Sequence, residues 1–419
     1  MKVLRKLVQF LPKSMRGKLI RNYLINIPTY FDDEITIKLA EKHEELDAAF
    51  KLVYEAYLHE GLIQEDNTQR RYSLFHLLPS TNTVVAIKEG EVIGTFSLIL
   101  EEEEGILPLD KDFDTRSYKK HGRRIGEVIG LAIKPNFRGG KSGLLFMLMK
   151  YLYQFSIDYL KVDIIQIATA PSRKLLYEDV LMFNAVDNGK IINDPWVNNR
   201  QMTGYYLDLI NAKDHYFRTL KNERQGIKLY DFFVNEKLHQ FIFPDKWKKT
   251  FHSSFINKMT YDALFRPCLD KLWNDADSSL KNYLFNLYKH YSPFEQTQEK
   301  HFIERRRELK FMVHIPASVV CDGKIHKAYI SELSNKNLKL VTDSKFPIQQ
   351  EYTLVCHIEE TIKIKLAIED IKGNQLYVMK ILEGNQGFHD LFSLLEKHLL
   401  RHLGIPERRR KNLTKSNYS

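Results

Sequence analysis

Apolar and polar positions in the first half of the chain follow two periods, one typical of strands and one typical of helices. Runs rich in β-branched residues at 83–88 and 92–100 are joined by Glu89-Gly90-Glu91, which predicts a hairpin turn. Alternation of strands with amphipathic helices favours a mixed α/β layer architecture. The expected elements are strand 35–39, helix 44–57, the hairpin, strand 127–134, helix 142–160, strand 163–169 and a helix that begins near Ser172.

The second half of the chain changes character twice. Residues 208–300 are rich in aromatic and basic residues at helical spacing, and we interpret them as a helical insert or connector. Beyond residue 305, short strand-like segments at close spacing predict a small antiparallel β-barrel. A helix at 388–403 and a basic tail from Arg408 follow. The strands are expected at 311–320, 327–333, 338–341, 352–357, 362–371 and 375–382.

These changes divide the chain into five parts. We expect a basic amphipathic segment at 1–30, an α/β domain at 31–207, a helical connector at 208–300, a β-barrel at 301–384, and a C-terminal helix with a basic tail at 385–419.

In the first part, no acidic residue precedes Asp32. A helix with this composition either lies on an anionic membrane surface or docks on the protein's own core, and the pattern is common to both. Its apolar face is formed by Val3, Leu4, Leu7, Val8 and Leu11.

Composition narrows the classes of function. The 419 residues carry a formal net charge of +10, and 43% of them are hydrophobic, enough for buried cores. The positive charge favours an acidic partner: nucleic acid, anionic lipid or an acidic carrier protein. No polymer of nucleic acid is expected, because the basic residues do not interleave with aromatic residues in a recognisable binding motif.

Cysteine usage and hydropathy indicate the compartment. Cys268, Cys321 and Cys356 are far apart with no histidine at ligand spacing, so neither a disulfide framework nor a metal site is expected. No apolar stretch reaches the roughly 20 residues of a membrane-spanning helix, since Lys150 interrupts the longest one. We therefore expect a cytoplasmic protein, either free or in peripheral contact with the inner face of the membrane.

Residues 127–143, EVIGLAIKPNFRGGKSG, carry the most informative pattern in the chain. An apolar strand ends at a Pro-Asn break, and a glycine-rich turn opens onto the apolar helix LLFMLMKYLYQF. The start of a helix presents backbone N–H groups without intrahelical partners, and such groups bind phosphate. The turn, with Arg138, Gly139, Gly140 and Gly143, is therefore a candidate cofactor site.

The order of these elements, and the residues on three of them, resemble a known family. The three segments are VYEAYLHEGLI at 53–63, EVIGLAIKPNFR at 127–138 and APSRKLLYEDVLMFNAV at 170–186. They are similar to the N-acyl amino acid synthases of the GNAT superfamily, which depend on acyl carrier protein and are related to acyl-homoserine-lactone synthases. The resemblance covers about residues 31–186. It implies a GNAT-like mixed sheet flanked by helices, and transfer of a long acyl chain from a phosphopantetheine thioester to an amino group.

One departure from the family pattern concerns the acyl donor. The GNAT pyrophosphate loop usually reads R/Q-x-x-G-x-G/A, and Lys141 stands where the middle glycine belongs. A phosphopantetheine arm on a carrier protein lacks the pyrophosphate and 3′-phosphate of coenzyme A. An altered loop is therefore compatible with acyl carrier protein as the partner, while acyl-CoA stays open as the alternative donor.

Attack of an amine on a thioester requires a base, a donor to the oxyanion and an acid for the departing thiolate. Glu127, at the start of the central strand, is the candidate base. Alternatively, it is a solvated carboxylate or one paired with Arg123 or Arg124. His121 is a second candidate base, or a residue of a polar loop.

The oxyanion donor is expected on the same strand. Backbone N–H groups near Gly130 and Leu131 are candidates, and Gly130 either lets the pantetheine arm approach closely or marks a bulge. By resemblance, Tyr177 stands where many GNAT enzymes keep the acid that protonates the thiolate. A tyrosine beside Leu175 and Leu176 is alternatively a packed core aromatic.

An amino acid acceptor needs a cation for its carboxylate, preferably the fork of an arginine. Arg70, Arg71, Arg124 and Arg173 are candidates, and solvation at the surface is the alternative for each. Residues 146–155 either line a tunnel for the acyl chain or form ordinary core.

The C-terminal barrel resembles PilZ domains, which bind cyclic di-GMP through an RxxxR arm and a D/N-x-S-x-x-G strand segment. Here the arm reads RRRELK at 305–310 and the strand segment reads ELSNKN at 332–337, so both motifs are degenerate. Lysine lacks the bidentate grip of arginine on phosphate. The alternative is a barrel kept for structure or protein contact. By resemblance, the candidate nucleotide-binding residues are Arg305, Arg306, Lys310, Ser334 and Asn337.

The sequence thus predicts an N-acyltransferase that moves a long acyl chain from acyl carrier protein to an amino group, of an amino acid in the first instance, with a PilZ-like accessory domain. Two alternatives stay open. One is a GNAT enzyme that uses acyl-CoA on a peptide or small amine. The other is a non-catalytic effector that binds membrane surfaces or cyclic di-GMP.

Overall fold

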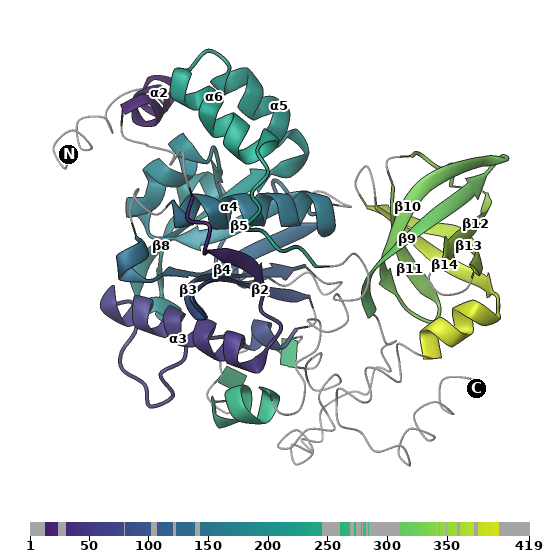
Figure 1. Ribbon diagram of the computed structural model, residues 1–419, viewed down its shortest axis with the longest axis horizontal. Helices are drawn as coiled ribbons and strands as arrows, with labels where there is room; N and C mark the ends of the chain where they lie inside the picture. The colour runs from purple at the N-terminus through teal and green to yellow at the C-terminus, as the bar shows by residue number, and fades with distance from the viewer. Residues whose placement is uncertain are drawn as a thin grey trace. The chain divides into compact units, whose positions relative to one another are not determined.

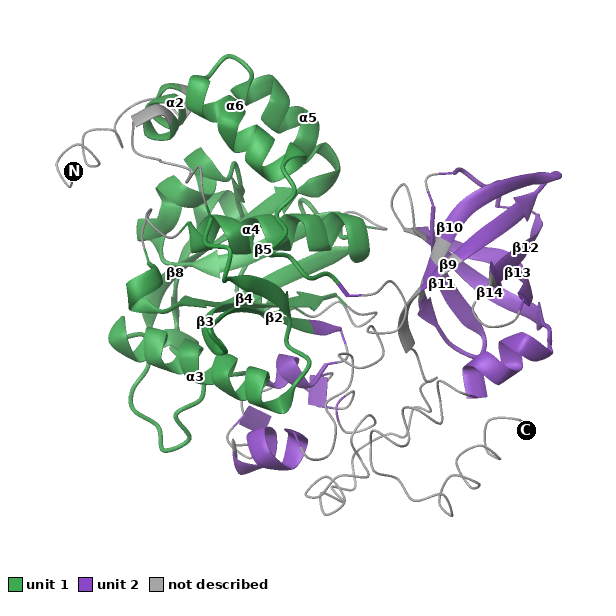
Figure 2. Cartoon of the chain, viewed as in Figure 1, with its two compact units in different colours: residues 1–72, 82–243 green, residues 73–81, 244–419 purple. Residues whose placement is uncertain are grey.

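The chain forms two compact units in a computed structural model (Figure 2). One comprises residues 1–72 and 82–243, and the other comprises residues 73–81 and 244–419. The structure describes residues 13–23, 31–78, 80–101, 107–119, 123–138, 143–244, 260–268, 272–273, 278, 280–281, 284, 311–342, 344–348, 350–357, 361–372 and 376–393.

One mixed sheet organises the first unit, with its strands in the order β1-β2-β3-β4-β5-β8-β6 and with β7 paired to β8 (Figure 1). β4 and β5 run parallel, whereas β5 and β8 are antiparallel. The expected mixed α/β fold is therefore confirmed. The strands are β1 (Thr36–Leu39), β2 (Thr81–Lys88), β3 (Glu91–Leu100), β4 (Ile125–Ile133), β5 (Ile164–Thr169), β6 (Asn184–Ala185), β7 (Ile191–Asp194) and β8 (Arg200–Asp208).

Helices cover both faces of this sheet (Figure 1). The amphipathic helix α3 (His43–His59) buries Leu52 and Val53 in a core cluster with Val85 of the sheet. α4 (Leu144–Gln154) lies close to β3, because a Cβ on Gly94 would come within 3.1 Å of Leu148. α4 continues as a π-helix over Phe155–Tyr159.

The helix expected to begin near Ser172 is present as two short elements. The chain forms a 3₁₀ turn at Pro171–Arg173 and a π-helix at Leu175–Val180. Its last helical bond runs from the Leu181 N–H to the Leu176 carbonyl, and the chain then turns toward β6. The strands β6, β7 and β8, which follow it, were not recognised in the sequence.

The helices α5 (Leu209–Leu220) and α6 (Arg224–Tyr230) belong to the first unit, which extends to Phe243. The predicted boundary at residue 207 therefore does not coincide with the edge of this unit. α2 (Lys13–Tyr23) packs on α6 and on the π-helix Leu175–Val180. The proposed apolar face of the N-terminal segment, formed by residues 3–11, lies outside the described residues.

The second unit contains an antiparallel barrel in which each of six strands has two neighbours, in the ring β10-β11-β14-β13-β12-β9. The strands expected there are all present, and β13 shows the alternation of exposed and buried residues most clearly, from Thr361 to Ile368. They are β9 (Phe311–Cys321), β10 (Lys324–Leu333), β11 (Asn337–Val341), β12 (Glu351–His357), β13 (Thr361–Lys372) and β14 (Leu376–Gly384).

Residues 386–393 begin the expected C-terminal helix, and its remainder and the basic tail lie outside the described residues. Within the described part of the chain, no helix is long and apolar enough to cross a membrane.

Candidate active site

The central feature of the first unit is the place where β4 and β5 separate. The two strands pair in parallel from Ile125 with Ile164 as far as Val128 with Ile167. Beyond that pair, β4 continues to Ile133 against β3, while the end of β5 pairs with β8. The backbone of β4 after Val128 therefore faces an opening between two diverging strands.

A bulge in β4 lies directly at this opening. Thr95 is opposite Ala132 and Ser97 is opposite Ile129, so Gly130 and Leu131 together stand opposite one residue of β3. Gly130 has φ +63°, a conformation that glycine adopts without strain. Gly130 thus marks a bulge, and the bulge re-aims the backbone groups of Gly130 and Leu131.

Glu127 lies on β4 just before the opening and is only 1% exposed. Its Oε2 accepts hydrogen bonds from the Leu109 N–H at 3.0 Å and from Gln166 Nε2 at 2.9 Å. Burial raises the pKa of Glu127 to about 8, against the lowering effect of these two hydrogen bonds. Glu127 is therefore not a solvated carboxylate. The other candidate base, His121, lies outside the described residues.

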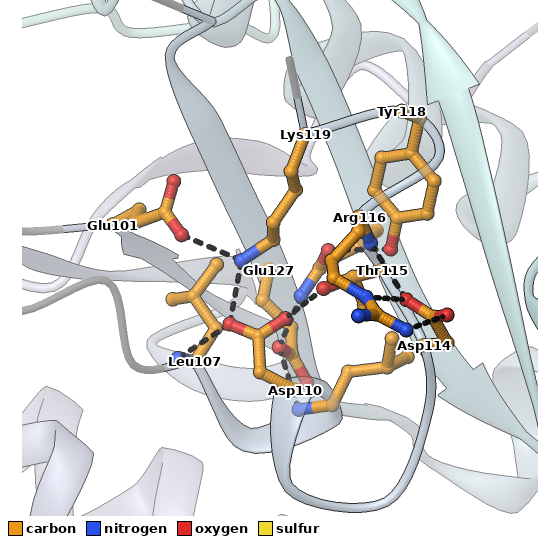
Figure 3. A network of polar contacts seen from close by, with 11 residues as sticks. Glu101, Leu107, Asp110, Asp114, Thr115, Arg116, Tyr118, Lys119 and Glu127 are labelled. Atoms are coloured by element: carbon orange, nitrogen blue, oxygen red, sulfur yellow. Dashed lines mark hydrogen bonds and ion pairs between the residues drawn. The ribbon is translucent and has the colours of Figure 1, made fainter. Parts of the chain in front are cut away.

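A polar network holds Glu127 in place (Figure 3). The Tyr118 hydroxyl donates to Gln166 Oε1 at 2.8 Å, which turns the Gln166 NH₂ toward Glu127. The ring of Tyr118 stacks on Tyr206 with centroids 4.1 Å apart. Sequence reasoning missed Gln166, although a lone polar residue in the apolar strand IIQIAT is a recognisable signal.

The segment that supplies the Leu109 N–H is fixed by its own ion pairs. Lys119 Nζ lies 2.5 Å from Glu101 and 2.5 Å from Asp110 (Figure 3). Asp110 also accepts from the Leu107 N–H and from Thr115 Oγ1. The turn that binds Glu127 is thus tied to the rest of the sheet.

Tyr177 lies in the π-helix Leu175–Val180 and is buried. Its ring stacks on Tyr205 at 5.5 Å and meets the edge of Phe183 at 5.5 Å. Burial raises the pKa of Tyr177, and the neighbouring Tyr57 on α3 raises it further, while Arg173 lowers it. The predicted acid is thus a packed aromatic whose phenol stays neutral.

Tyr57 belongs to a second polar group around Arg71. The Arg71 guanidinium lies 4.1 Å from the ring centroid of Trp196 and donates to the Trp196 carbonyl. Burial raises the pKa of Tyr57 and lowers the pKa of Arg71. Asp194 acts electrostatically on both groups, so the three side chains share one region.

The structure separates the candidate arginines. Arg70 is paired with Asp47 at 2.5 Å, and Arg173 is exposed and 3.7 Å from Glu60. Among the described residues, no carboxylate lies within ion-pair distance of Arg71. Arg124 is engaged in contacts of its own within the unit.

The glycine-rich turn is described only in part. Gly139 and Gly140 lie outside the described residues, whereas Gly143 has φ +64° and its carbonyl accepts the first helical bond of α4 from Met147. Arg138 donates to the Ile133 carbonyl at 2.7 Å and lies 3.5 Å from Glu60. Arg138 and Arg173 therefore meet on one carboxylate, at the C-terminal end of α3.

Residues 146–155, considered for an acyl tunnel, are mostly buried among aromatic rings. Phe146 meets Phe232 edge-on, and Tyr151 stacks on Phe243 at 4.7 Å. These contacts are those of ordinary core.

In the second unit, Ser334 is buried and its hydroxyl is committed to a local turn. It donates to the Asn337 carbonyl at 2.8 Å and accepts from the Asn337 N–H at 2.8 Å. Arg305, Arg306 and Lys310 lie outside the described residues. Within the described part of the chain, no group of acidic, histidine or cysteine side chains could hold a metal ion.

Comparison with known proteins gives the class of this domain. Residues 48–200 match the sequence model of the family described as N-acyl amino acid synthase FeeM. This segment includes Glu127, Gly130, Arg71, Tyr177 and Trp196. The match supports an acyltransferase, and the chain carries an acyltransferase domain over these residues.

Solved structures of low similarity were also found. FeeM from uncultured soil microbes is 18% identical over 43% of this chain and 93% of its own, with a TM-score of 0.37. The acyl-homoserine-lactone synthase LasI is 13% identical over 42% and 89%, with a TM-score of 0.33. The CoA-dependent acyl-homoserine lactone synthase BjaI, solved with SAM and isopentyl-CoA, is 13% identical over 52% and 96%, with a TM-score of 0.35. No curated protein matches the chain.

The raised pKa of Glu127 predicts a specific pH dependence of stability. Between the ordinary carboxyl pKa of 4.5 and about 8, the unfolded chain releases a proton that the folded chain keeps, so folding stability falls as pH rises through this window. The substitution Glu127→Gln removes the titrating group, so this fall in folding stability with rising pH is removed. We expect the melting temperature of Glu127→Gln minus that of the wild type to be larger at pH 8.5 than at pH 5. A difference independent of pH would show that Glu127 titrates normally.

Proposed function

We propose that the chain is an N-acyl amino acid synthase, which transfers a long acyl chain from the phosphopantetheine thioester of acyl carrier protein to the amino group of an amino acid. The observation that carries this proposal is the buried Glu127 carboxylate, two residues before β4 separates from β5. The match of residues 48–200 to the model of the N-acyl amino acid synthase FeeM family also supports the proposal. The alternative donor is acyl-CoA and the alternative acceptor a peptide or small amine.

The opening between β4 and β5 suits an extended pantetheine arm. Backbone N–H and carbonyl groups of β4 beyond Val128 no longer pair with β5 and are available to the amide groups of the arm. The bulge at Gly130 and Leu131 lies on the same stretch of β4 and changes the direction of its N–H groups. In the proposal, one of them hydrogen-bonds the thioester oxygen as negative charge develops there.

In the proposal, two side chains carry out proton transfer. The ionised Glu127 accepts a proton from the ammonium of the acceptor, and the free amine attacks the thioester carbon. A C–N bond forms, the nitrogen releases its second proton to solvent, the C–S bond breaks, and the electron pair leaves on sulfur. Glu127 returns the first proton to solvent. Neutral Tyr177 donates a hydrogen bond and its proton to that sulfur, and the phenol is protonated again from solvent. The products are an amide and a free thiol.

The surroundings of Glu127 explain why it would act near neutral pH. A carboxyl of ordinary pKa is a weak base toward an ammonium group, whereas burial brings the pKa of Glu127 to about 8. The ionised fraction of Glu127 rises as pH increases through this value. The acylation rate at saturating substrate is therefore expected to rise over the same range.

The first test is mass spectrometry of lipid extracts from cells that express the wild type, Glu127→Gln, Tyr177→Phe or the control Glu91→Gln. Glu91 is an exposed strand residue paired with Lys134, away from Glu127. We expect N-acylated species from the wild type and the control, and a loss of about 100-fold or more in Glu127→Gln, the usual contribution of a general base. Tyr177→Phe should lower the yield about tenfold or more.

Two outcomes of this experiment, and one of a separate assay with purified protein, would count against parts of the proposal. Equal products from wild type and Glu127→Gln would keep the enzyme and reject the base. Turnover of purified protein with acyl-CoA and none with acyl carrier protein would favour the alternative donor. No product from any variant would favour a non-catalytic effector.

The acceptor carboxylate is assigned to Arg71, because the described residues leave its guanidinium without an ion-pair partner. Arg71→Gln is expected to raise KM for the amino acid about 10- to 100-fold and to leave KM for the acyl donor unchanged, since a charge-assisted bidentate contact is lost. Arg70→Gln is the matched control, because Arg70 is already paired with Asp47. Equal effects of both variants on KM would reject the assignment.

The PilZ resemblance of the second unit gives a regulatory hypothesis, in which cyclic di-GMP binds the barrel. The turn at Ser334 could serve it only through backbone groups, because the Ser334 hydroxyl is already bonded. Titration of the full chain with cyclic di-GMP in a calorimeter should show saturable binding that Lys310→Ala weakens. Absence of saturable binding at physiological concentrations would remove the receptor hypothesis.

A further inference from the structure

The N-terminal helix α2 is fastened to the π-helix that carries Tyr177. Arg16 Nε lies 2.8 Å from Asp179 Oδ2, and Arg16 Nη2 lies 3.4 Å from Glu178 Oε2. Both acids belong to the π-helix Leu175–Val180. Arg16 and Asp179 are buried, so this contact is not a solvated surface pair.

Arg21 on the same helix makes a second attachment. Its guanidinium grips the Glu223 carboxylate with two bonds, of 2.8 Å and 2.7 Å, and donates a third bond to the Asp179 backbone carbonyl. Glu223 stands at the start of α6. Arg21 therefore joins α2, α6 and the π-helix at one buried point.

The bond to the Asp179 carbonyl has a particular role in the π-helix. The last carbonyls of a helix have no N–H partner within it, and a cation placed there satisfies them. The N–H groups that follow are already used, because Leu181 donates to Leu176 and Phe183 donates to Tyr177. Arg21 thus satisfies a backbone carbonyl at the C-terminal end of the π-helix that contains Tyr177.

Tyr177 is linked to these groups through its stacking partner as well. Tyr205 lies parallel to Tyr177, and Glu178, Arg16 and Asp179 all act electrostatically on the Tyr205 phenol. A displacement of Arg16 or Arg21 would therefore change the position of Tyr177 through the backbone of the π-helix and through the stacked Tyr205 ring.

Glycine at position 17 makes the Arg21 contact sterically accessible. A Cβ on Gly17 would lie 2.8 Å from Nη1 of Arg21, so any larger residue displaces the guanidinium. Glycine inside a helix makes the helix less stable than alanine does. Gly17 is thus unfavourable for α2 as an isolated helix and favourable for the attachment.

We propose that Arg16 and Arg21 are positioning residues, which hold the π-helix from α2 so that Tyr177 can serve the departing thiolate. This inference rests on the proposed function for the role of Tyr177. It assigns to the basic N-terminal segment a task inside the enzyme, because two of its cations are engaged by Asp179 and Glu223 and are not available to a membrane surface.

The test combines hydrogen exchange with steady-state kinetics on the full chain. The variants are Arg21→Gln, Arg21→Lys, Gly17→Ala and the control Lys18→Gln, whose side chain is on the exposed side of α2. We expect faster exchange in residues 175–183 for Arg21→Gln and Gly17→Ala, and unchanged exchange for Lys18→Gln. Arg21→Lys, which keeps the charge and loses the fork, should be intermediate.

The kinetic part separates positioning from general damage to the fold. Arg21→Gln and Gly17→Ala should lower kcat about tenfold with little change in KM for the acceptor. In a Tyr177→Phe background the same substitutions should have little further effect on kcat, because both act through one group.

Two results would overturn the inference. Unchanged exchange in residues 175–183 would show that α2 does not hold the π-helix, whatever the activity. Faster exchange together with kcat losses that add to that of Tyr177→Phe would show that the hold does not act through Tyr177. A wild type that makes no N-acylated product would reject the proposed function, while exchange would still measure the attachment.

Discussion

The burial of one carboxyl group, Glu127, sets the conditions for the rest of the first unit. A carboxylate removed from water loses hydration free energy, and hydrogen bonds from Gln166 and the Leu109 N–H compensate only part of this loss. The part of the loss that is not compensated disfavours the ionised form, which raises the pKa of Glu127. Tyr118 orients Gln166, and the ion pairs of Lys119 hold the segment that contains Leu109. Each therefore fixes one of the two hydrogen-bond donors to Glu127.

The sheet brings the base and the substrate opening together through strand register. Glu127 pairs with Gln166, and the following pair, Val128 with Ile167, is the last before the strands separate. The bulge at Gly130 and Leu131 falls two and three residues beyond Val128. A shift of one residue between β4 and β5 would turn Glu127 to the other face of the sheet and remove it from Gln166.

Much of the fold and part of the site could be predicted from the sequence. The hairpin strands and β4 are apolar runs bounded by turn residues, barrel strands such as β13 alternate with a two-residue period, and Glu127 is a charged residue in an apolar strand that leads to a glycine-rich turn. The difference between Arg70 and Arg71 could not be predicted, because adjacent residues have the same composition signal and only the fold places Asp47 beside one of them. The docking of α2 could not be predicted either, because Asp179 and Glu223 lie far from it in the sequence.

That distance has a consequence for how the molecule is made. Arg16 and Asp179 are separated by 163 residues, and Arg21 and Glu223 by 202. Contacts between such remote residues form late, because a long loop must close first. On a ribosome, α2 is therefore synthesised well before Asp179 and Glu223, and neither contact can form until those residues have emerged. Glu223 follows β8, so the pair of Arg21 with Glu223 forms only after every strand of the first sheet has been synthesised.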